Sequence, residues 1–311
     1  RYNKIEDSIQ IMNVNKCLYI NKYRDSYRWK GKNMEFYKYH SLGNDYLVYD
    51  CRKNEEELNA DQIVRICTRK FGIGADGIVA GPYMDGDRMY VKVYNADGSE
   101  TEQGGNAIRI FAHYLKSIGE VQRESFTLYT KSGEVDIRFL NREGTRIQMS
   151  MGQLSFSSKK LGLSGPEREA VHEYFNFGGE EYDCTCVSTG NPHCVIIADE
   201  ISRAKICNIG KYSECADYFP DRTNTLIVKV LDKNNIQIEI FERGVGYTLS
   251  SATCSCAAAG AAFRQGLIDS DVMVHMPGGK LWTQIDEDWN VKMIGSVKRI
   301  CKMELFEDFF H

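Results

Sequence analysis

The stretch S-L-G-N-D-Y-L-V-Y-D at positions 41–50 returns in altered form as S-T-G-N-P-H-C-V-I-I-A-D at positions 188–199. Each copy joins a Gly-Asn turn to a run rich in β-branched and aromatic residues, which is typical of a turn that leads into a strand. The two asparagines, Asn44 and Asn191, lie 147 positions apart. Similarity at one fixed offset indicates that the chain contains a repeated structural unit.

The same offset aligns further landmarks along the chain. It pairs Gly104 with Ser251, and each of these residues precedes an Ala-containing stretch with helical character, 106–115 and 253–263. It also pairs residues at turns and at the ends of β-rich runs, namely Tyr94-Asn95 with Phe241-Glu242 and Gly77 with Asn224. We therefore predict an α/β chain made of two pseudo-symmetric lobes.

The predicted boundaries follow from the repeat. The lobes are expected at 34–153 and 154–303, with an N-terminal extension at 1–33 and a tail at 304–311. The extension mixes Lys and Arg with Tyr and Trp29, and it is either a flexible arm, a partner-docking segment or a result of start-site choice.

Composition excludes several classes of protein. With 42% hydrophobic and 26% charged residues, the 311-residue chain is typical of a globular protein with two domains. A net charge of -4 does not favour a nucleic-acid partner. Because we find neither a membrane-length apolar run nor a signal peptide, we expect a cytoplasmic protein without a membrane partner.

Cysteine usage points to reduced thiols. Eleven cysteines are an odd number, and they are scattered through segments that look like strands and helices. Two C-x-C pairs, Cys184/Cys186 and Cys254/Cys256, lack the two-residue spacer of a zinc knuckle. We therefore expect no metal and no disulfide framework.

The repeat also predicts a ligand. If the two halves pack face to face, two helix N-termini converge and supply N–H donors and positive dipole ends that suit a carboxylate. Neutral amides would add directed hydrogen bonds, and an adjacent anion and cation would bind an ammonium and a carboxylate. The residues concerned are Asn44, Asn95, Asn191, Asn224, Glu242 and Arg243. Together they describe a site for an amino-acid zwitterion.

Plainer interpretations exist for each of these residues. Asn and Gly often occupy loops as turn residues, because both tolerate left-handed backbone conformations. An Arg beside a Glu is commonly a solvated surface pair. His193, which follows Pro192, is readily explained as a packed or orienting residue.

Long motifs carry a resemblance to a known family. They are H-S-L-G-N-D-Y at 40–46, F-G-I-G-A-D-G at 71–77, Y-N-A-D-G-S-E-T-E-Q at 94–103, G-N-P-H at 190–193, R-T-N at 222–224 and E-R-G-V-G at 242–246. In this order, from about Met34 to near the C-terminus, they resemble the diaminopimelate epimerase superfamily.

The resemblance implies two domains, each a curved mixed β-sheet wrapped around a central helix, and a PLP-independent site that needs no cofactor and no metal. It also implies that substrate is held by Asn44, Asn95, Gly105, Asn106, Asn191, Asn224, Glu242 and Arg243. We add His193 and the backbone of Ala252 and Thr253 to this substrate-binding set. A homodimer is compatible with the resemblance, because dimers are common in related folds.

The chain departs from the family in its chemistry. Family racemases carry one cysteine at each facing helix N-terminus, where one thiolate removes the α-proton and the opposite thiol returns one. The equivalent positions here are Gly104, which has no side chain, and Ser251. A hydroxyl is a poor base unless a neighbour activates it. Tyr247 also replaces the glutamate usual after E-R-G-V-G.

Two residues remain as catalytic candidates, Ser251 and Cys254. Cys254 lies three residues after Ser251, in the first helical turn, where the helix dipole lowers a thiol pKa. The alternative is that Cys254 is an inert thiol packed where the family has glycine.

Three explanations of the missing thiols compete: an engineered Cys-to-Ser change, natural divergence and a catalytically dead paralogue. The changed surroundings favour divergence. The leading function is thus a cofactor-independent isomerase-family enzyme that acts at or near the α-carbon of a free amino acid or derivative. The alternatives are a one-base lyase, dehydratase or cyclase, and an inactive amino-acid-binding protein.

Overall fold

The computed structural model describes residues 33–54, 56–101 and 104–310. The predicted N-terminal extension at 1–33 therefore lies outside the described residues, apart from Asn33. Residues Phe36–Met303 form one compact unit, and residues 33–35 and 304–310 belong to a separate unit.

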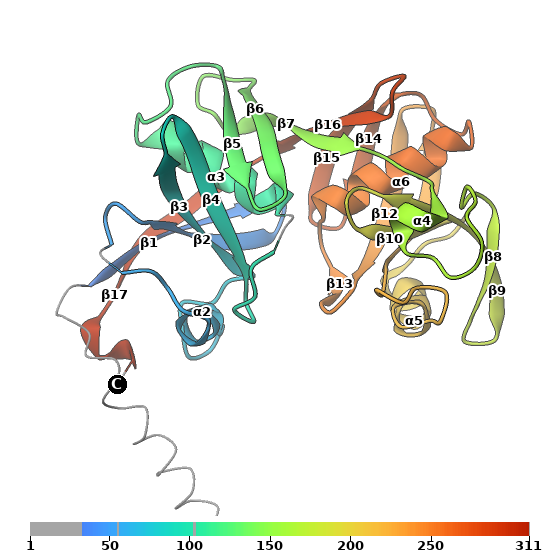
Figure 1. Cartoon of the computed structure of the whole chain (residues 1–311), viewed down its shortest axis with the longest axis horizontal. Helices are drawn as coiled ribbons and strands as arrows, with labels where there is room; N and C mark the ends of the chain where they lie inside the picture. The colour runs from blue at the N-terminus through green and yellow to red at the C-terminus, as the bar shows by residue number, and fades with distance from the viewer. Residues whose placement is uncertain (1–32, 55, 102–103, 311) are drawn as a thin grey trace, which may run out of the picture. The chain divides into compact units, whose positions relative to one another are not determined.

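The first half of the chain alternates pairs of strands with helices (Figure 1). Its elements are β1 (Met34–Ser41), β2 (Asn44–Asp50), α2 (Ala60–Cys67), β3 (Gly77–Asp85), β4 (Arg88–Asn95), α3 (Gly105–Ser117), β5 (Ser125–Thr130), β6 (Gly133–Phe139) and β7 (Arg146–Gln153).

The second half repeats this order with small additions. Its elements are α4 (Ser158–Leu161), β8 (Glu173–Phe177), β9 (Glu180–Ser188), β10 (Pro192–Ile197), α5 (Arg203–Ser213), β11 (Asn224–Asp232), β12 (Asn235–Glu242), β13 (Gly246–Thr248), α6 (Ala252–Arg264), β14 (Asp271–Met276), β15 (Gly279–Ile285), β16 (Asn290–Ser296), β17 (Lys298–Leu305) and the 3₁₀ turn η1 (Glu307–Phe310).

Strand register confirms the pseudo-symmetric repeat. In the parallel pair β2–β3, Tyr46 lies opposite Gly77, and in the parallel pair β10–β11, His193 lies opposite Asn224. Both partners are thus displaced by the predicted 147 residues. Helices α3 and α6, which begin at Gly105 and Ala252, keep the same offset.

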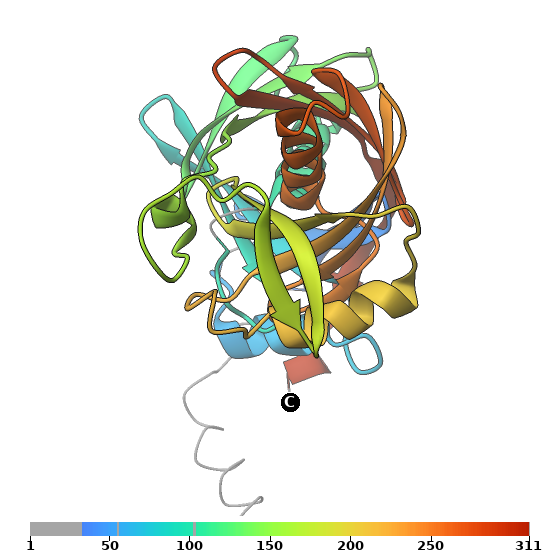
Figure 2. The same ribbon diagram turned by 90° about the vertical axis from the view of Figure 1, so that its right-hand side faces the viewer.

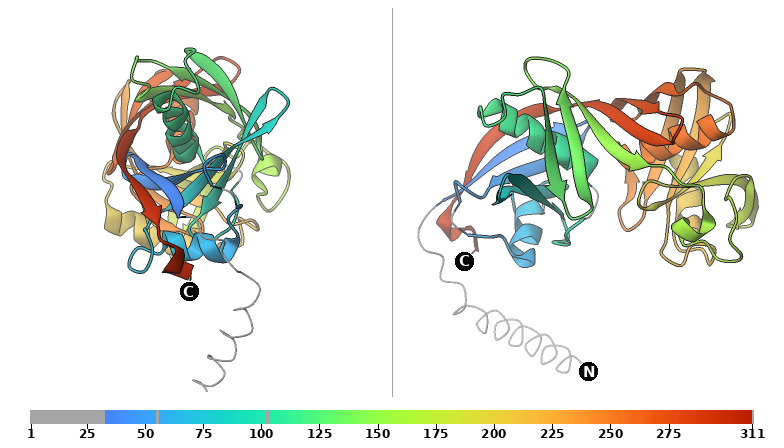
Figure 3. Two further views of the ribbon diagram at one scale, coloured as in Figure 1. Left: turned by 90° about the vertical axis from the view of Figure 1, so that its left-hand side faces the viewer. Right: turned by 45° about the horizontal axis from the view of Figure 1, so that its top comes forward.

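Each half is built around one buried helix. In α3 the residues from Gly105 to Leu115 are buried, and in α6 those from Ala252 to Ala262 are buried. A helix that is enclosed on all sides needs apolar or small residues all round, which explains the alanines at 257–259. Figure 2 shows α6 surrounded by strands, and the left view of Figure 3 shows the same for α3.

The two halves share a strand pairing. Strand β7, which ends the first half, runs antiparallel to β16, with Met149 opposite Met293. The exact lobe boundary at 153/154 and the tail at 304–311 stay predictions. None of the described helices has both the length and the apolar character needed to cross a membrane.

Candidate active site

The N-termini of α3 and α6 meet. A Cβ atom added to Gly105 would lie only 2.7 Å from the Cβ of Ala252. Neither N-cap residue, Gly104 or Ser251, hydrogen-bonds the first turn of its helix through a side chain. The first-turn N–H groups and both positive dipole ends therefore point to the same place, which is the arrangement that binds an anion.

A pocket of about 250 Å³ opens beside these helix starts. Its polar part consists of hydroxyl, amide and carboxyl groups, and its apolar part of thioether and branched side chains. The lining residues are Gly104, Gly105, Ile108, Ser132, Glu134, Val135, Met149, Ser150, Met151, Gly152, Gln153, Thr189, Gly190 and Thr253. Of the predicted site residues, Gly104, Gly105 and Thr253 border it.

On α3, a chain of amides extends from the helix N-terminus to a carboxylate. Nδ2 of Asn106 donates to Oδ1 of Asn44 at 2.9 Å, and Nδ2 of Asn44 donates to Oδ2 of Asp76 at 2.8 Å. Asp76 also accepts the Asp45 N–H and pairs with Arg69. The quoted motif at 71–77 contains Asp76, but sequence reasoning did not single it out.

A second group of predicted residues gathers around His193. Its Nδ1 lies 2.9 Å from the Asn191 carbonyl, and its Nε2 lies 3.3 Å from Nδ2 of Asn224. Oδ1 of Asn224 in turn accepts the Arg243 N–H at 3.0 Å. Burial lowers the pKa of His193 to about 4, so the ring is neutral at pH 7. His193 therefore orients its neighbours and does not titrate near neutral pH.

Two predicted ligand residues make local bonds. Nδ2 of Asn95 donates to Oγ of Ser99 within the same turn. The Arg243 guanidinium donates to the Asp221 carbonyl at 2.9 Å, although it was expected to face a carboxylate ligand. Both side chains remain half-buried. Binding of substrate by either one requires that it exchange or share its present partner.

Ser251 hydrogen-bonds to Glu242. Oγ of Ser251 donates to Oε2 of Glu242 at 3.0 Å, while Oγ1 of Thr248 donates to Oε1 at 2.7 Å. Burial raises the pKa of Glu242 above its ordinary value, and the nearby charge of Asp76 adds to the rise. Glu242 was expected only as a ligand for substrate. Its hydrogen bond to Ser251 places a proton acceptor beside this hydroxyl.

Cys254 does not match its expected environment. The side chain is fully buried in the main core cluster, and burial raises its pKa well above the ordinary value. The expectation that the helix dipole lowers this pKa is wrong, because desolvation of a buried thiolate outweighs the dipole.

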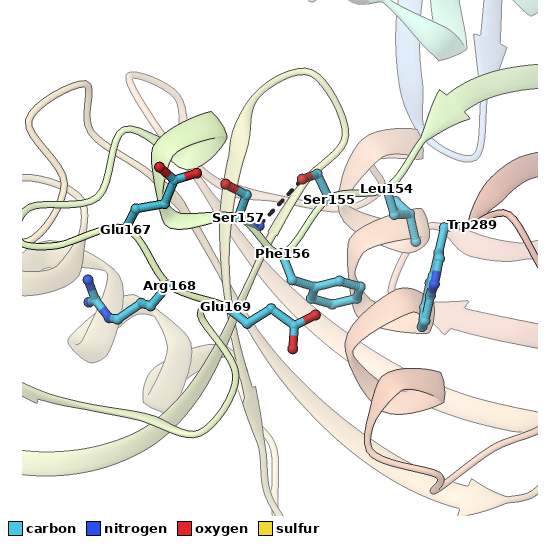
Figure 4. A pocket seen from close by; sticks show the side chains of 8 residues that line it. All are labelled: Leu154, Ser155, Phe156, Ser157, Glu167, Arg168, Glu169 and Trp289. Atoms are coloured by element: carbon cyan, nitrogen blue, oxygen red, sulfur yellow. Dashed lines mark hydrogen bonds between the residues drawn. The ribbon is translucent and has the colours of Figure 1, made fainter.

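A second hollow of about 350 Å³ lies apart from the predicted site residues. Its lining residues are Leu154, Ser155, Phe156, Ser157, Glu167, Arg168, Glu169 and Trp289. In Figure 4 the rings of Phe156 and Trp289 meet edge to face, with centroids 5.0 Å apart. Glu169 is engaged in an ion pair with Arg264. This hollow shares no residue with the site at the helix N-termini.

The C-x-C cysteines are core residues. Cys184, Cys186, Cys254 and Cys256 are all buried. Within the described part of the chain, no group of three or more His, Cys, Asp or Glu side chains is arranged to hold a metal ion.

Comparison with known proteins adds to this geometry. The family model for diaminopimelate epimerase matches residues 36–157 and 185–300. Over 279 residues the chain is 42% identical to diaminopimelate epimerase 2 of Nostoc sp. (strain PCC 7120), covering 89% of this chain and 97% of the relative. It is 34% identical to the diaminopimelate epimerase of Synechocystis sp. (strain PCC 6803), covering 86% and 97%.

Solved structures share the fold at low sequence identity. A phenazine biosynthesis protein of the PhzF family from Bacillus anthracis superposes with a TM-score of 0.65 at 16% identity, covering 89% of this chain and 100% of the other. A hydroxyproline epimerase from Agrobacterium vitis, with bound trans-4-hydroxy-L-proline, gives 0.64 at 13% identity, covering 92% and 94%. These likenesses confirm the predicted fold class.

The matches place the protein in the class of epimerase-like isomerases. Within that class, the chain belongs to the diaminopimelate epimerase family.

Proposed function

We propose that this enzyme acts at the α-carbon of a free amino acid and that Glu242, together with Ser251, transfers the proton on one face only. Diaminopimelate, which appears in the names of the relatives, is the first candidate substrate. The observation that carries this proposal is the hydrogen bond between Ser251, the N-cap residue of α6, and Glu242 at the end of β12. Gly104 offers no side chain at the start of α3.

The substrate carboxylate is proposed to bind the N–H groups of Gly105 and Asn106 on α3 and of Ala252 and Thr253 on α6. The meeting of the two helix N-termini supports this placement, because neither is capped by a side chain. The amides of Asn44, Asn191 and Asn224, with Arg243, supply the remaining polar contacts.

In the proposed reaction, Glu242 takes the α-proton, either directly or through the Ser251 hydroxyl. The electron pair of the broken C–H bond delocalises into the substrate carboxylate, where two helix N-termini stabilise the added negative charge. If the same group then returns a proton to the same face, the α-hydrogen has exchanged with solvent and the configuration of the α-carbon is kept. If the substrate carries a leaving group on its β-carbon, the electron pair instead forms a Cα–Cβ double bond as that group departs.

Symmetric two-base epimerisation is disfavoured on this proposal. One positioned acid or base contributes about 10² to 10⁴ in rate, and position 104 offers none. The buried, high-pKa thiol of Cys254 does not replace it.

Incubation with LL- and meso-diaminopimelate in deuterated water tests the proposal, with mass spectrometry and chiral chromatography as the readouts. We expect solvent deuterium at an α-carbon without interconversion of the LL and meso forms. Rapid interconversion of the forms, with deuterium in both, overturns the one-sided mechanism.

An inactive amino-acid-binding protein is the second candidate, and the absence of a side chain at Gly104 favours it. Calorimetric binding of diaminopimelate without any deuterium incorporation during a long incubation would select this alternative.

A further inference from the structure

Arg109 is a fully buried cation in the interior of α3. Its Nη2 donates to Oδ1 of Asn106 at 2.5 Å and to Oγ of Ser41 at 2.7 Å. Its Nη1 lies 3.2 Å from the Met293 sulfur, and its Nε has no hydrogen-bond partner. Across residues 33–310, leaving out 55, 102, 103 and the side chain of residue 307, no carboxylate forms an ion pair with it.

Such a charge is costly to keep. Desolvation lowers the pKa of Arg109 to about 10, which still leaves it protonated at pH 7. A buried charge without a counterion disfavours folding. The fold nevertheless makes room for it, because a Cβ on Gly295 of β16 would lie only 2.8 Å from Nε of Arg109. Burial of an apolar side chain in this place would destabilise the fold less than burial of a charge. Packing alone therefore does not explain the arginine.

The hydrogen bonds of Arg109 continue toward the candidate site. Asn106 accepts from Arg109 through Oδ1 and donates to Asn44 through Nδ2. Asn44 then donates through its own Nδ2 to Asp76. A guanidinium can only donate and an ionised carboxylate can only accept. The two ends therefore allow just one orientation for each amide between them.

We propose that Arg109 is a positioning residue that sets the amide orientation of Asn106 and Asn44. Its second effect is to hold positive charge behind the N-terminus of α3, which strengthens the attraction for an anion there. The identity of that anion as an amino-acid carboxylate rests on the proposed function, whereas the orientation of the amides does not.

The first test uses the full chain without ligand, labelled with ¹⁵N at the asparagine side chains. Arg109→Met removes the donor, so we expect the NH₂ signals of both Asn106 and Asn44 to shift, although Arg109 does not touch Asn44. Ile110→Ala is the matched control, because Ile110 is equally buried on the same helix. It should lower stability and leave the Asn44 signals in place. Unchanged Asn44 signals in Arg109→Met, or equal shifts in both variants, overturn the proposal.

The reverse perturbation covers the case in which Arg109→Met does not fold. Asn44 is only half-buried, so Asn44→Ala is expected to fold. With ¹⁵N-arginine labelling, Asn44→Ala should shift the guanidinium signals of Arg109 through Asn106. Guanidinium signals identical to those of the unmodified protein overturn the proposed coupling of Arg109 to Asn44 through Asn106.

Calorimetric titration with LL-diaminopimelate distinguishes the positioning role of Arg109 from the proposed substrate. We expect Arg109→Met to bind about tenfold more weakly than the unmodified chain. In an Asn106→Ala background, Arg109→Met should cause a smaller further loss, because only its charge is then removed, whereas a purely structural role predicts equal losses in both backgrounds. If the unmodified chain binds no diaminopimelate, the proposed substrate fails, and the ligand-free spectra still decide the role of Arg109.

Discussion

Ser251 and Glu242 lie nine residues apart in the chain, and Oγ of the serine donates to Oε2 of the glutamate at 3.0 Å. The short strand β13 makes this possible, because it folds back on β12 with Gly246 opposite Glu242. The turn thus brings a half-buried carboxylate to the N-cap of α6. A weakly basic hydroxyl gains a partner that can accept its proton.

Removal of the Glu242 carboxylate should slow proton exchange strongly. We expect Glu242→Gln to lower the rate of α-deuterium incorporation by about 10² to 10⁴, which is the usual contribution of a positioned base. Ser251→Ala should lower it as well. The measurement is mass spectrometry of diaminopimelate after incubation in deuterated water.

Glu239→Gln is the matched control for this experiment. Glu239 lies on the same strand and also accepts a bond from a hydroxyl, that of Tyr247, at 2.8 Å. Its exchange rate should equal that of the unmodified chain. Comparable losses in Glu239→Gln and Glu242→Gln would mean that the carboxylate at 242 has no special role.

The pH dependence of stability follows from the raised pKa of Glu242. Because the folded-state pKa lies above the unfolded one, the folded protein favours the protonated carboxyl. This contribution to stability is present at low pH and is lost as pH rises through the folded pKa. Glu242→Gln should therefore raise Tm relative to the unmodified chain at pH 8, with little difference at pH 4. Thermal unfolding across this range checks it, and the opposite trend would contradict the burial argument.

The exchange rate should depend on pH in the opposite direction to stability. Proton abstraction needs the ionised carboxylate, so the exchange rate should fall as pH drops through the raised pKa of Glu242. The neutral His193 should cause no change of the exchange rate near pH 7, because its pKa is about 4. A rate that stays constant as pH drops through the acidic range would argue against this assignment.

The contact between the two helix N-termini predicts a rescue. Gly105→Ala places a methyl group 2.7 Å from the Cβ of Ala252, so it should lower the free energy of unfolding by about 1 to 3 kcal/mol through overpacking. Ala252→Gly in the same chain should restore much of the loss. Denaturant unfolding of both single variants and the double variant measures the coupling. Additive effects would show that the two helix starts do not touch.

Binding should depend on the polar residues of the second half and not on its core thiols. We expect Asn191→Ala and Arg243→Ala to weaken diaminopimelate binding in calorimetry. Cys184→Ala and Cys186→Ala remove fully buried side chains, so they should lower Tm with little change in Kd. Equal losses of affinity in all four variants would count against the proposed carboxylate site.

Much of the fold could be predicted because its signals are local. Neighbouring residues determine the turns at Asn44 and Asn191. They also determine where the helices at 105 and 252 begin. Their common spacing predicted the repeat that the strand register confirms. The motifs likewise led to the family that the comparisons show.

The partners of individual side chains were not predictable in this way. Asp76, Arg109 and the bond between Ser251 and Glu242 became visible only in the folded chain. Position in the first turn of a helix predicted a low pKa for Cys254, yet packing of the core around that helix raises it.

By itself, the sequence determined the repeated α/β architecture and the family, and it has Gly104 and Ser251 at the starts of the two repeated helices. Only the tertiary structure decided which of the remaining polar groups is buried, charged or bonded to another. The physical reason is that backbone turns and helix starts depend on neighbouring residues, whereas desolvation and hydrogen bonding depend on segments that meet only when the chain folds.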